Sequence, residues 1–232
     1  MQRAGDSCRP VFYCADMNAS GNVTTQPPVL AGAHVRLEPL SGAHVAGLVA
    51  AAAQDPSLYD WSAIPQGEAA MHLYVDAALA ERAAGTALPF ATLRAADGVV
   101  LGSTRFFLIE RWAWPAGDAN AAPGRIDGCE IGYTWLGRAA VRTAANTEAK
   151  LLMLAHAFEA WDAWRVCFHT DVRNERSRNA LSRIGAQFEG VLRAHRLAID
   201  ATPRDSARFS ITRAEWPGVR RRLERLLATR SG

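Results

Sequence analysis

The chain has 232 residues, 49% of them hydrophobic and 21% charged, with a formal net charge of +3. This length supports one sizeable core, so we expect one domain of ordinary soluble globular composition. The small net charge argues against a nucleic-acid-binding protein, and no run of about 20 apolar residues is available to span a bilayer. The four cysteines, Cys8, Cys14, Cys129 and Cys167, show no C-x-x-C spacing, which argues against a zinc site or a disulfide framework.

The first 30 residues lack the apolar segment of a signal peptide and are rich in Gly, Asn, Thr and Pro. We therefore predict a disordered tail over residues 1–30, a domain over residues 31–232 and a cytoplasmic protein. Met17 is an alternative start of the chain.

Hydrophobic periodicity and turn residues predict alternating strands and helices in the first half of the domain. These elements are a strand over 35–40, an Ala-rich helix capped by Ser41, a helix from Glu68 to Arg82 ended by Gly85, strands over 89–94 and 99–109 joined by a turn at Asp97-Gly98, and a long loop over 112–124. A loop of that length is either functional or disordered.

The second half predicts a strand, a helix and a second strand, which together form a βαβ unit with two parallel strands. Its elements are a strand over 129–136, a helix over 147–161, a strand over 166–170, a helix over 175–184 ended by Gly185, strands over 187–199 and 208–212, and a last helix from about Glu215. Regular alternation places Glu130, Gly132 and Thr134 on one face of the first strand, and Ile131, Tyr133 and Trp135 on the other.

Two helix N-termini follow the two parallel strands and should lie side by side. The loop before the first helix, 142–147, has little side-chain bulk, and a helix start presents unpaired N–H groups with positive dipole charge. This arrangement predicts a site for a phosphate or diphosphate. The second helix opens with Asn174, which also suits an ordinary N-cap.

The sequence resembles the GCN5-related N-acetyltransferase superfamily, particularly its Rim-type branch, in three features. They are this order of elements, the Arg-x-x-small-x-small loop, and Asn174-x-x-Ser177 followed by Arg183-Ile184-Gly185-Ala186. The resemblance covers about residues 33–227. It implies an α/β fold whose mixed, mostly antiparallel sheet has a central, splayed pair of parallel strands flanked by helices. It also implies acetyl-CoA as cosubstrate and no metal. The chain departs from the family loop at Ala145 and Thr147, and an alanine held at positive φ there would cost on the order of 1 kcal/mol.

The resemblance assigns the cofactor site residue by residue. The backbone of three strand residues pairs with the pantetheine arm, the loop binds the diphosphate, and two residues of the second helix contribute from the opposite side. The expected cofactor-binding residues are Tyr133, Thr134, Trp135, Arg142, Thr143, Ala144, Ala145, Asn146, Thr147, Asn174 and Arg183.

Acetyl transfer by direct attack needs a neutral amine, stabilisation of the oxyanion and protonation of the thiolate. As in Rim-type enzymes, Glu130 is the candidate base and Ser177 the candidate donor to the sulfur, because Leu181 stands where many family members carry a tyrosine. A backbone N–H between Gly132 and Thr134 is expected to stabilise the oxyanion. We assign no catalytic role to His72, His156, His169 or His195.

We therefore predict an N-acetyltransferase that acts on a protein or peptide N-terminus or on a small amine. The alternative is a non-catalytic acyl-CoA-binding or regulatory module with the same fold. The basic residues Arg220, Arg221, Arg222 and Arg225 are interpreted as a solvated helix face, not as a nucleic-acid site. A homodimer is one of the oligomeric states that we expect.

Overall fold

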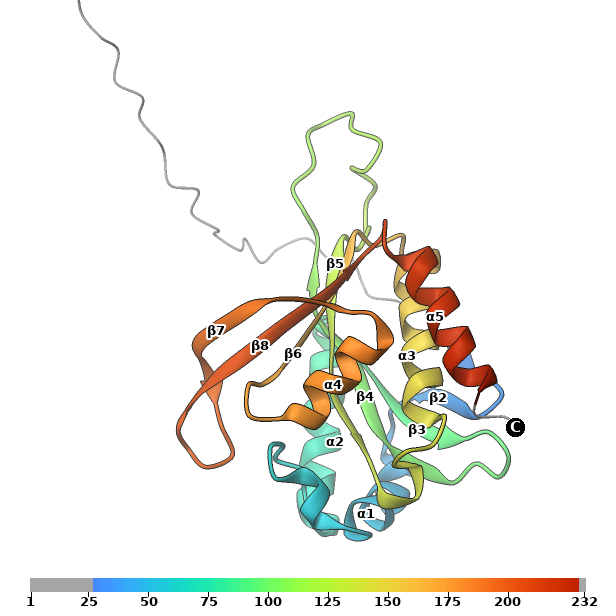
Figure 1. Ribbon diagram of the computed structural model, residues 1–232, viewed down its shortest axis with the longest axis vertical. Helices are drawn as coiled ribbons and strands as arrows, with labels where there is room; N and C mark the ends of the chain where they lie inside the picture. The colour runs from blue at the N-terminus through green and yellow to red at the C-terminus, as the bar shows by residue number, and fades with distance from the viewer. Residues whose placement is uncertain (1–26, 230–232) are drawn as a thin grey trace, which may run out of the picture.

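The computed structural model describes residues 27–229, which form an eight-stranded sheet with helices on both faces (Figure 1). The strands are β1 (Leu30–Ala31), β2 (Val35–Pro39), β3 (Ala87–Arg94), β4 (Val100–Glu110), β5 (Gly128–Leu136), β6 (Arg165–Asp171), β7 (Gln187–Leu197) and β8 (Pro203–Thr212). Their order is β1-β2-β3-β4-β5-β6-β8-β7, and β5 with β6 is the parallel pair among antiparallel neighbours. The predicted fold class is confirmed.

Five α-helices and several short turns connect the strands. The helices are α1 (Val45–Ala53), α2 (Glu68–Ala83), α3 (Ala145–Ala155), α4 (Glu175–Ile184) and α5 (Trp216–Ala228). The 3-10 turns are η1 (Gly42–His44), η2 (Pro56–Tyr59) and η3 (Arg138–Ala140), and a π turn, η4 (His156–Ala160), extends α3. The tail predicted over residues 1–30 and the alternative start at Met17 lie almost entirely outside the described residues.

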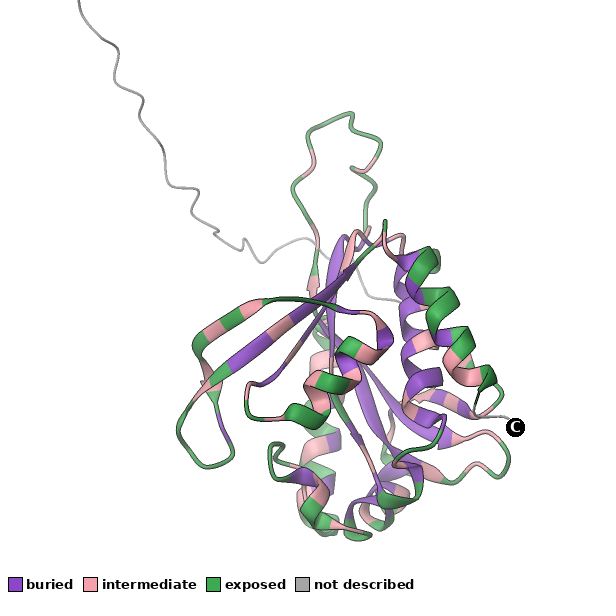
Figure 2. Ribbon diagram, in the orientation of Figure 1, coloured by how far each residue is buried: buried purple, intermediate pink, exposed green. Residues whose placement is uncertain are grey.

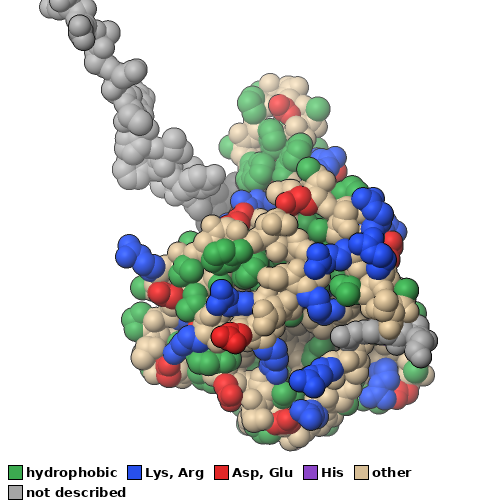
Figure 3. Space-filling view, viewed as in Figure 1, with side chains coloured by type: hydrophobic (Ala, Val, Ile, Leu, Met, Phe, Trp, Pro, Cys, Tyr) green, Lys and Arg blue, Asp and Glu red, His purple; other side chains and the backbone are tan. Residues whose placement is uncertain are grey.

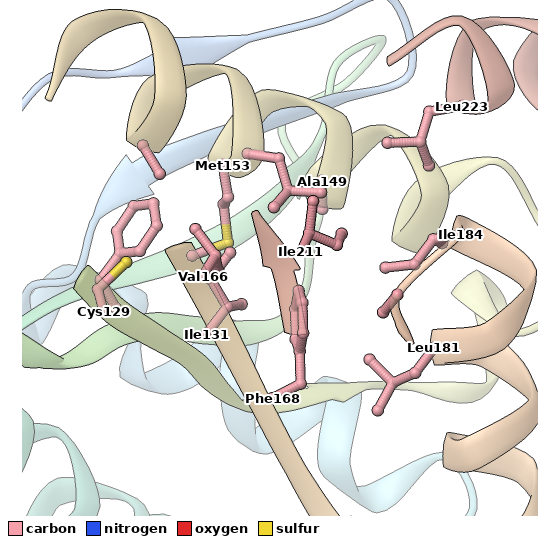
Figure 4. Close-up of a cluster of buried hydrophobic side chains, with 14 of the residues drawn as sticks. Cys129, Ile131, Ala149, Met153, Val166, Phe168, Leu181, Ile184, Ile211 and Leu223 are labelled. Carbon is pink, nitrogen blue, oxygen red and sulfur yellow. The ribbon is translucent and has the colours of Figure 1, made fainter. Parts of the chain in front are cut away.

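Two hydrophobic clusters, one on each face, hold the helices to the sheet. Residues of α1 and α2 pack with Ala91, Leu93 and Trp135 on one face. On the other face, α3, α4 and α5 cover the larger cluster, where Met153 lies with Ile131 and Val166 (Figure 4). Figure 2 shows the buried strands between these layers and the exposed outer sides of α4 and α5. Among the helices within residues 27–229, none combines the length and apolarity needed to cross a bilayer.

The parallel pair β5–β6 is short and then opens. Its pairing extends from Gly128 to Glu130 on β5, opposite Arg165 to Cys167 on β6. β6 continues to Asp171 paired with β8, whereas β5 continues to Leu136 paired with β4. Beyond Glu130, the edges of β5 and β6 that face each other are therefore left without strand partners in the described chain, as the predicted splay requires.

A β-bulge in β5 overturns the predicted alternation of its side chains. Tyr133 has φ 50°, and the register with β4 shifts between Arg105↔Gly132 and Ser103↔Trp135. Tyr133 therefore packs against Phe107, the cross-strand partner of Glu130. The extra residue of a bulge reverses the faces that follow it.

Thr134 consequently turns toward α3, where its hydroxyl lies 2.8 Å from Lys150 Nζ, and Trp135 joins the α1–α2 cluster. The prediction that Thr134 shares a face with Glu130 is wrong.

The long loop between β4 and β5 contains no helix or strand and extends away from the domain (Figure 1). Asp127 holds the two ends of this loop together, because the Asp127 carboxylate accepts hydrogen bonds from Trp112 N–H at 2.8 Å and from Trp114 Nε1–H at 2.9 Å. Charged side chains of both signs are interspersed on the face that carries α4 (Figure 3). On α5, Arg220 pairs with Glu159 and Glu224, consistent with the predicted solvated face.

A buried carboxylate joins the N-terminal end of α3 to the start of the domain. Glu148 accepts hydrogen bonds from the N–H groups of Ala33, His34 and Val35 at 2.9, 2.6 and 2.6 Å. A Cβ on Gly32 would overlap this carboxyl group, so any larger residue there would displace it. This contact fixes the first turn of α3 against β2.

Candidate functional site

A cavity of about 890 Å³ lies where β5 and β6 separate. It extends from the N-terminal ends of α3 and α4 to the β7–β8 hairpin. Ten of the thirteen predicted site residues line it: Glu130, Tyr133, Thr134, Trp135, Arg142, Thr143, Asn146, Asn174, Ser177 and Arg183. The other three, Ala144, Ala145 and Thr147, are buried behind this wall. Residues distant in sequence are thus brought together as predicted.

The N-terminal turn of α3 provides the donors expected of an anion site. Its first helical hydrogen bond runs from Glu148 N–H to Ala144 C=O at 2.9 Å. The N–H groups of Asn146 and Thr147 precede that bond and remain directed out of the helix end. Ala145 N–H is already used, because it donates to Thr143 Oγ1 at 3.2 Å.

The expected strain at alanine does not occur in this loop. Ala144 adopts right-handed helical geometry and Ala145 begins the helix. The positive φ, 62°, falls on Arg142 instead, which is exposed at the cavity. The departure from the family loop at Ala145 therefore costs no backbone strain.

The start of α4 closes the opposite side of the cavity. Asn174 is the N-cap, and its Oδ1 accepts a hydrogen bond from Ser177 N–H at 3.0 Å. This confirms the ordinary capping interpretation of Asn174 and leaves its amide nitrogen for a ligand. Arg183 reaches across to α3, where its guanidinium donates to Thr147 Oγ1 at 3.1 Å. The two helix ends are thus linked beside the proposed anion site.

Glu130 does not stand alone in the cavity wall. Its Oε2 lies 2.5 Å from Nδ1 of His169 on β6, and both side chains are buried. Nε2 of His169 has no hydrogen-bond partner within the described chain. The ring centroids of His195 on β7 and His169 lie 4.9 Å apart. Burial is the main cause of a lowered pKa of His195, and the neighbouring His169 lowers it further.

Lys150 is a second group in this wall that the sequence did not single out. It lies on α3 and donates from Nζ to Thr134 Oγ1 at 2.8 Å and to Thr104 Oγ1 at 3.5 Å. It is buried, and no carboxylate of residues 27–229 forms an ion pair with it. Burial lowers its pKa from 10.5 to about 7.

From the sequence alone, His169 is assigned no catalytic role and Lys150 no role in the site. For His169 the missing information was the register of a parallel strand pair, which places Cys167 opposite Glu130. For Lys150 a signal existed, because the chain's single lysine falls at helical spacing on the inner side of a predicted helix.

The buried cysteines and His156 fill structural positions. No group of three His, Cys, Asp or Glu residues in residues 27–229 is arranged to hold a metal ion. Cys129 and Cys167 are buried free thiols, and burial raises the pKa of Cys129 well above its usual value. His156 packs among Phe106 and Trp161.

Comparison with solved structures gives the same fold. A GCN5-related N-acetyltransferase from Brucella melitensis is 28% identical, with a TM-score of 0.72, covering 86% of this chain and 85% of that chain. A T. thermophilus protein assigned to the acetyltransferases is 35% identical, with a TM-score of 0.71, covering 87% and 97%. RimJ from Mycobacterium smegmatis, solved with CoA-disulfide, is 24% identical, with a TM-score of 0.68, covering 87% and 92%. At that identity the RimJ likeness concerns the fold.

No curated protein matches the sequence. The family model described as the acetyltransferase (GNAT) domain matches residues 34–187. That match spans most of the domain and includes both helix N-termini and the Glu130–His169 pair. The chain therefore belongs to the GNAT acetyltransferase family and is an acetyl-CoA-dependent N-acetyltransferase.

Proposed function

We propose that this protein transfers the acetyl group of acetyl-CoA to a primary amine, with the Glu130–His169 pair as the base. The observation that carries the proposal is the hydrogen bond between these buried side chains at the edge of the splay. If Nδ1 of His169 donates to the Glu130 carboxylate, Nε2 on the other side of the ring would be left as an acceptor. A buried acceptor of this kind is suited to take a proton from an attacking amine.

The cosubstrate fits the cavity from the side of α3 and α4. The N–H groups of Asn146 and Thr147 with the exposed Arg142 would hold the diphosphate. The unpaired edge of β5 from Ile131 to Leu136 would pair with the pantetheine arm. The diphosphate assignment rests on the N-terminal end of α3, and the pantetheine assignment rests on the free edge of β5.

The reaction is direct attack of the amine nitrogen on the thioester carbonyl. A C–N bond forms, the C–S bond breaks, and the products are the N-acetylated acceptor and the free thiol of coenzyme A. The Glu130–His169 pair takes the proton that the amine loses. Ser177, which lines the cavity at the start of α4, would donate a hydrogen bond to the departing sulfur.

The test is thiol release from acetyl-CoA against a panel of amines and peptide N-termini. Glu130→Gln and His169→Gln should each lower kcat about 100-fold, because general-base catalysis contributes about 10²–10⁴-fold. Coenzyme affinity measured by calorimetry should change little in both variants. The double variant should be little worse than either single one, since paired groups act as a unit.

Glu175→Gln is the matched control, because this glutamate lies in the first turn of α4 but does not line the cavity. Undiminished turnover in Glu130→Gln and His169→Gln would exclude the pair from the mechanism. Coenzyme binding without thiol release for any amine would favour the non-catalytic module. A protein or peptide N-terminus is proposed as acceptor over lysine, because an α-amine has pKa about 7.7–8.0 against about 10.4 for lysine. A cytoplasmic location and a homodimer stay predictions.

A further inference from the structure

Two arginines stand directly opposite each other in the β7–β8 hairpin. Arg196 on β7 is the cross-strand partner of Arg204 on β8. Directly opposed side chains of an antiparallel pair share a face of the sheet, and like charges in such positions are destabilising. A bulge at Ala194, with φ 47°, precedes Arg196 and sets this register.

Neither guanidinium is neutralised by a carboxylate. Within the part of the chain that the structure describes, neither arginine takes part in an ion pair. Arg204 donates instead to Ser206 Oγ at 2.9 and 3.1 Å, and Arg196 lies over the ring of Phe107 at 5.5 Å. Burial and then the charge of Arg196 lower the pKa of Arg204. The protein thus keeps two adjacent positive charges at a cost.

The nearby carboxylates are already occupied. Asp171 and Glu130 are the acidic groups that act on Arg204 electrostatically. Asp171 is held by Arg173, with contacts at 2.8 and 3.0 Å, and Glu130 is held by His169. Within residues 27–229 the arginine pair therefore has no carboxylate partner, and an anion bound in the cavity would satisfy it.

The pair belongs to the same cavity as the proposed base. Arg196 and Arg204 line it together with Glu130 and His169. Strand pairing places His169 opposite Arg208 on β8, and Arg204 shares the face of Arg208 because side chains alternate along a strand. The arginines therefore flank the base at the β7–β8 end of the cavity, away from the helix N-termini that suit the diphosphate.

We propose that Arg196 and Arg204 bind a carboxylate of the acceptor, so that the favoured substrate is an amine that carries a nearby acidic group. The inference rests on the proposed acetyl transfer to an amine and adds the class of acceptor. Guanidinium groups bind carboxylates with paired, charge-assisted hydrogen bonds. The carboxylate is either the α-carboxylate of a free amino acid or an acidic side chain next to a peptide N-terminus.

The experiment uses acceptor pairs that differ in one charge. L-Alanine against L-alaninamide tests the α-carboxylate, and Ser-Glu-Ala-amide against Ser-Gln-Ala-amide tests the side chain. The acidic member of at least one pair should show kcat/KM about ten-fold higher or more, a difference typical of one charge-assisted contact. The pair that shows it identifies the source of the carboxylate. An α-carboxylate also raises the pKa of the amine, which works against the expected preference.

Arg196→Gln and Arg204→Gln should each reduce this preference at least several-fold, mainly by raising KM for the acidic acceptor more than KM for the neutral acceptor. Arg193→Gln is the matched control, because Arg193 is an exposed residue of the same strand outside the cavity. Thermal melts of all three variants check folding, and removal of either opposed charge should not lower Tm.

Equal kcat/KM for both members of every pair would overturn this inference and leave the proposed acetyl transfer standing. A preference that persists in both arginine variants would also overturn it. Absence of transfer to any amine would overturn the proposed function, and this inference with it.

Discussion

Lys150 is a buried amine that forms no ion pair with a carboxylate of residues 27–229. Its ammonium meets two threonine hydroxyls, and burial lowers its pKa from 10.5 to about 7. An apolar side chain of similar length would avoid this cost, and the cavity position of Lys150 indicates why the charge is kept. A positive charge beneath the coenzyme path would favour the anionic cosubstrate.

We expect Lys150→Met to raise the free energy of unfolding at pH 7 by a few kcal/mol. The unfolded chain binds more protons at Lys150 than the folded chain between pH 7 and about 10.5, so wild-type stability rises with pH across that window. The advantage of the variant should be full below pH 7 and disappear toward pH 10.5. Urea unfolding of both proteins at pH 6, 8 and 9.5 measures it.

Because Lys150 is the chain's single lysine, no other ammonium of that type titrates in the same window. The remaining groups are common to both proteins and cancel in the difference. A stability difference that is the same at all three pH values would contradict the lowered pKa. Stabilisation accompanied by weaker coenzyme binding would support a functional charge.

Single residues also show where sequence reasoning reached its limit. Glu130 could be selected because a strand position and a family resemblance both pointed to it. His169 could not, since its contact with Glu130 depends on which residue of β6 lies beside it, and parallel register has no local signal. Leu181 was correctly expected to be unable to donate a proton, because side-chain chemistry is visible in the sequence.

At the scale of elements, the position of α3 depends on one carboxylate. Glu148 lies in the first turn, where negative charge interacts favourably with the helix dipole. It accepts three backbone hydrogen bonds from residues 33–35, at the start of β2. The same turn contains Asn146, which lines the cavity, and the N–H group of Thr147 next to it. An interaction on one side of the helix thus holds the donors on the other.

Glu148→Ala is expected to lower the free energy of unfolding by about 3 kcal/mol, because hydrogen bonds to a charged group contribute about 1.5–3 kcal/mol each and are not additive. Coenzyme affinity should fall as well, since the first turn of α3 loses its fixed position. Chemical denaturation and calorimetry measure the two effects.

Glu68→Ala on α2 is the control, because Glu68 is also a first-turn glutamate but is exposed, with His72 as its contact at 3.8 Å. It should change stability by less than about 0.5 kcal/mol. Equal effects of both substitutions would contradict the anchoring role of Glu148.

Elements were easier to predict than their faces. The helix from Glu175 to Ile184 and its end at Gly185, which adopts φ 99°, follow from local capping chemistry. The faces of β5 beyond Gly132 were wrong, because a bulge reverses alternation and its location depends on pairing with β4. Local signals specify where an element lies, whereas partner strands decide which way its side chains point.

At the scale of the whole molecule, the mixed sheet and the parallel pair could be predicted because a single helix between two neighbouring strands favours a parallel crossover. The resemblance added the splay. The arginine pair of the β7–β8 hairpin could not be anticipated, since Arg196 and Arg204 become neighbours through a bulged register. The part of the cavity that we propose to bind the acceptor is thus the part that is hardest to predict from local sequence.

Hydrogen exchange tests how the two parts of the sheet respond to coenzyme. With saturating coenzyme A, the amides of residues 131–136 should exchange at least about ten-fold more slowly, because a ligand that pairs with them blocks local opening. The amides of β3, which is paired on both sides, provide the internal control. Unchanged exchange over 131–136 would contradict the pairing of the pantetheine arm with β5.

The opening between β5 and β6 has a mechanical consequence. Strands β1–β5 and β6–β8 are joined across the sheet by the three-residue seam from Gly128 to Glu130. A cosubstrate bound in the gap would contact both parts of the sheet, and its release would remove those contacts. Product release would then be coupled to a small relative motion of these two parts of the sheet, centred on the seam that contains Glu130.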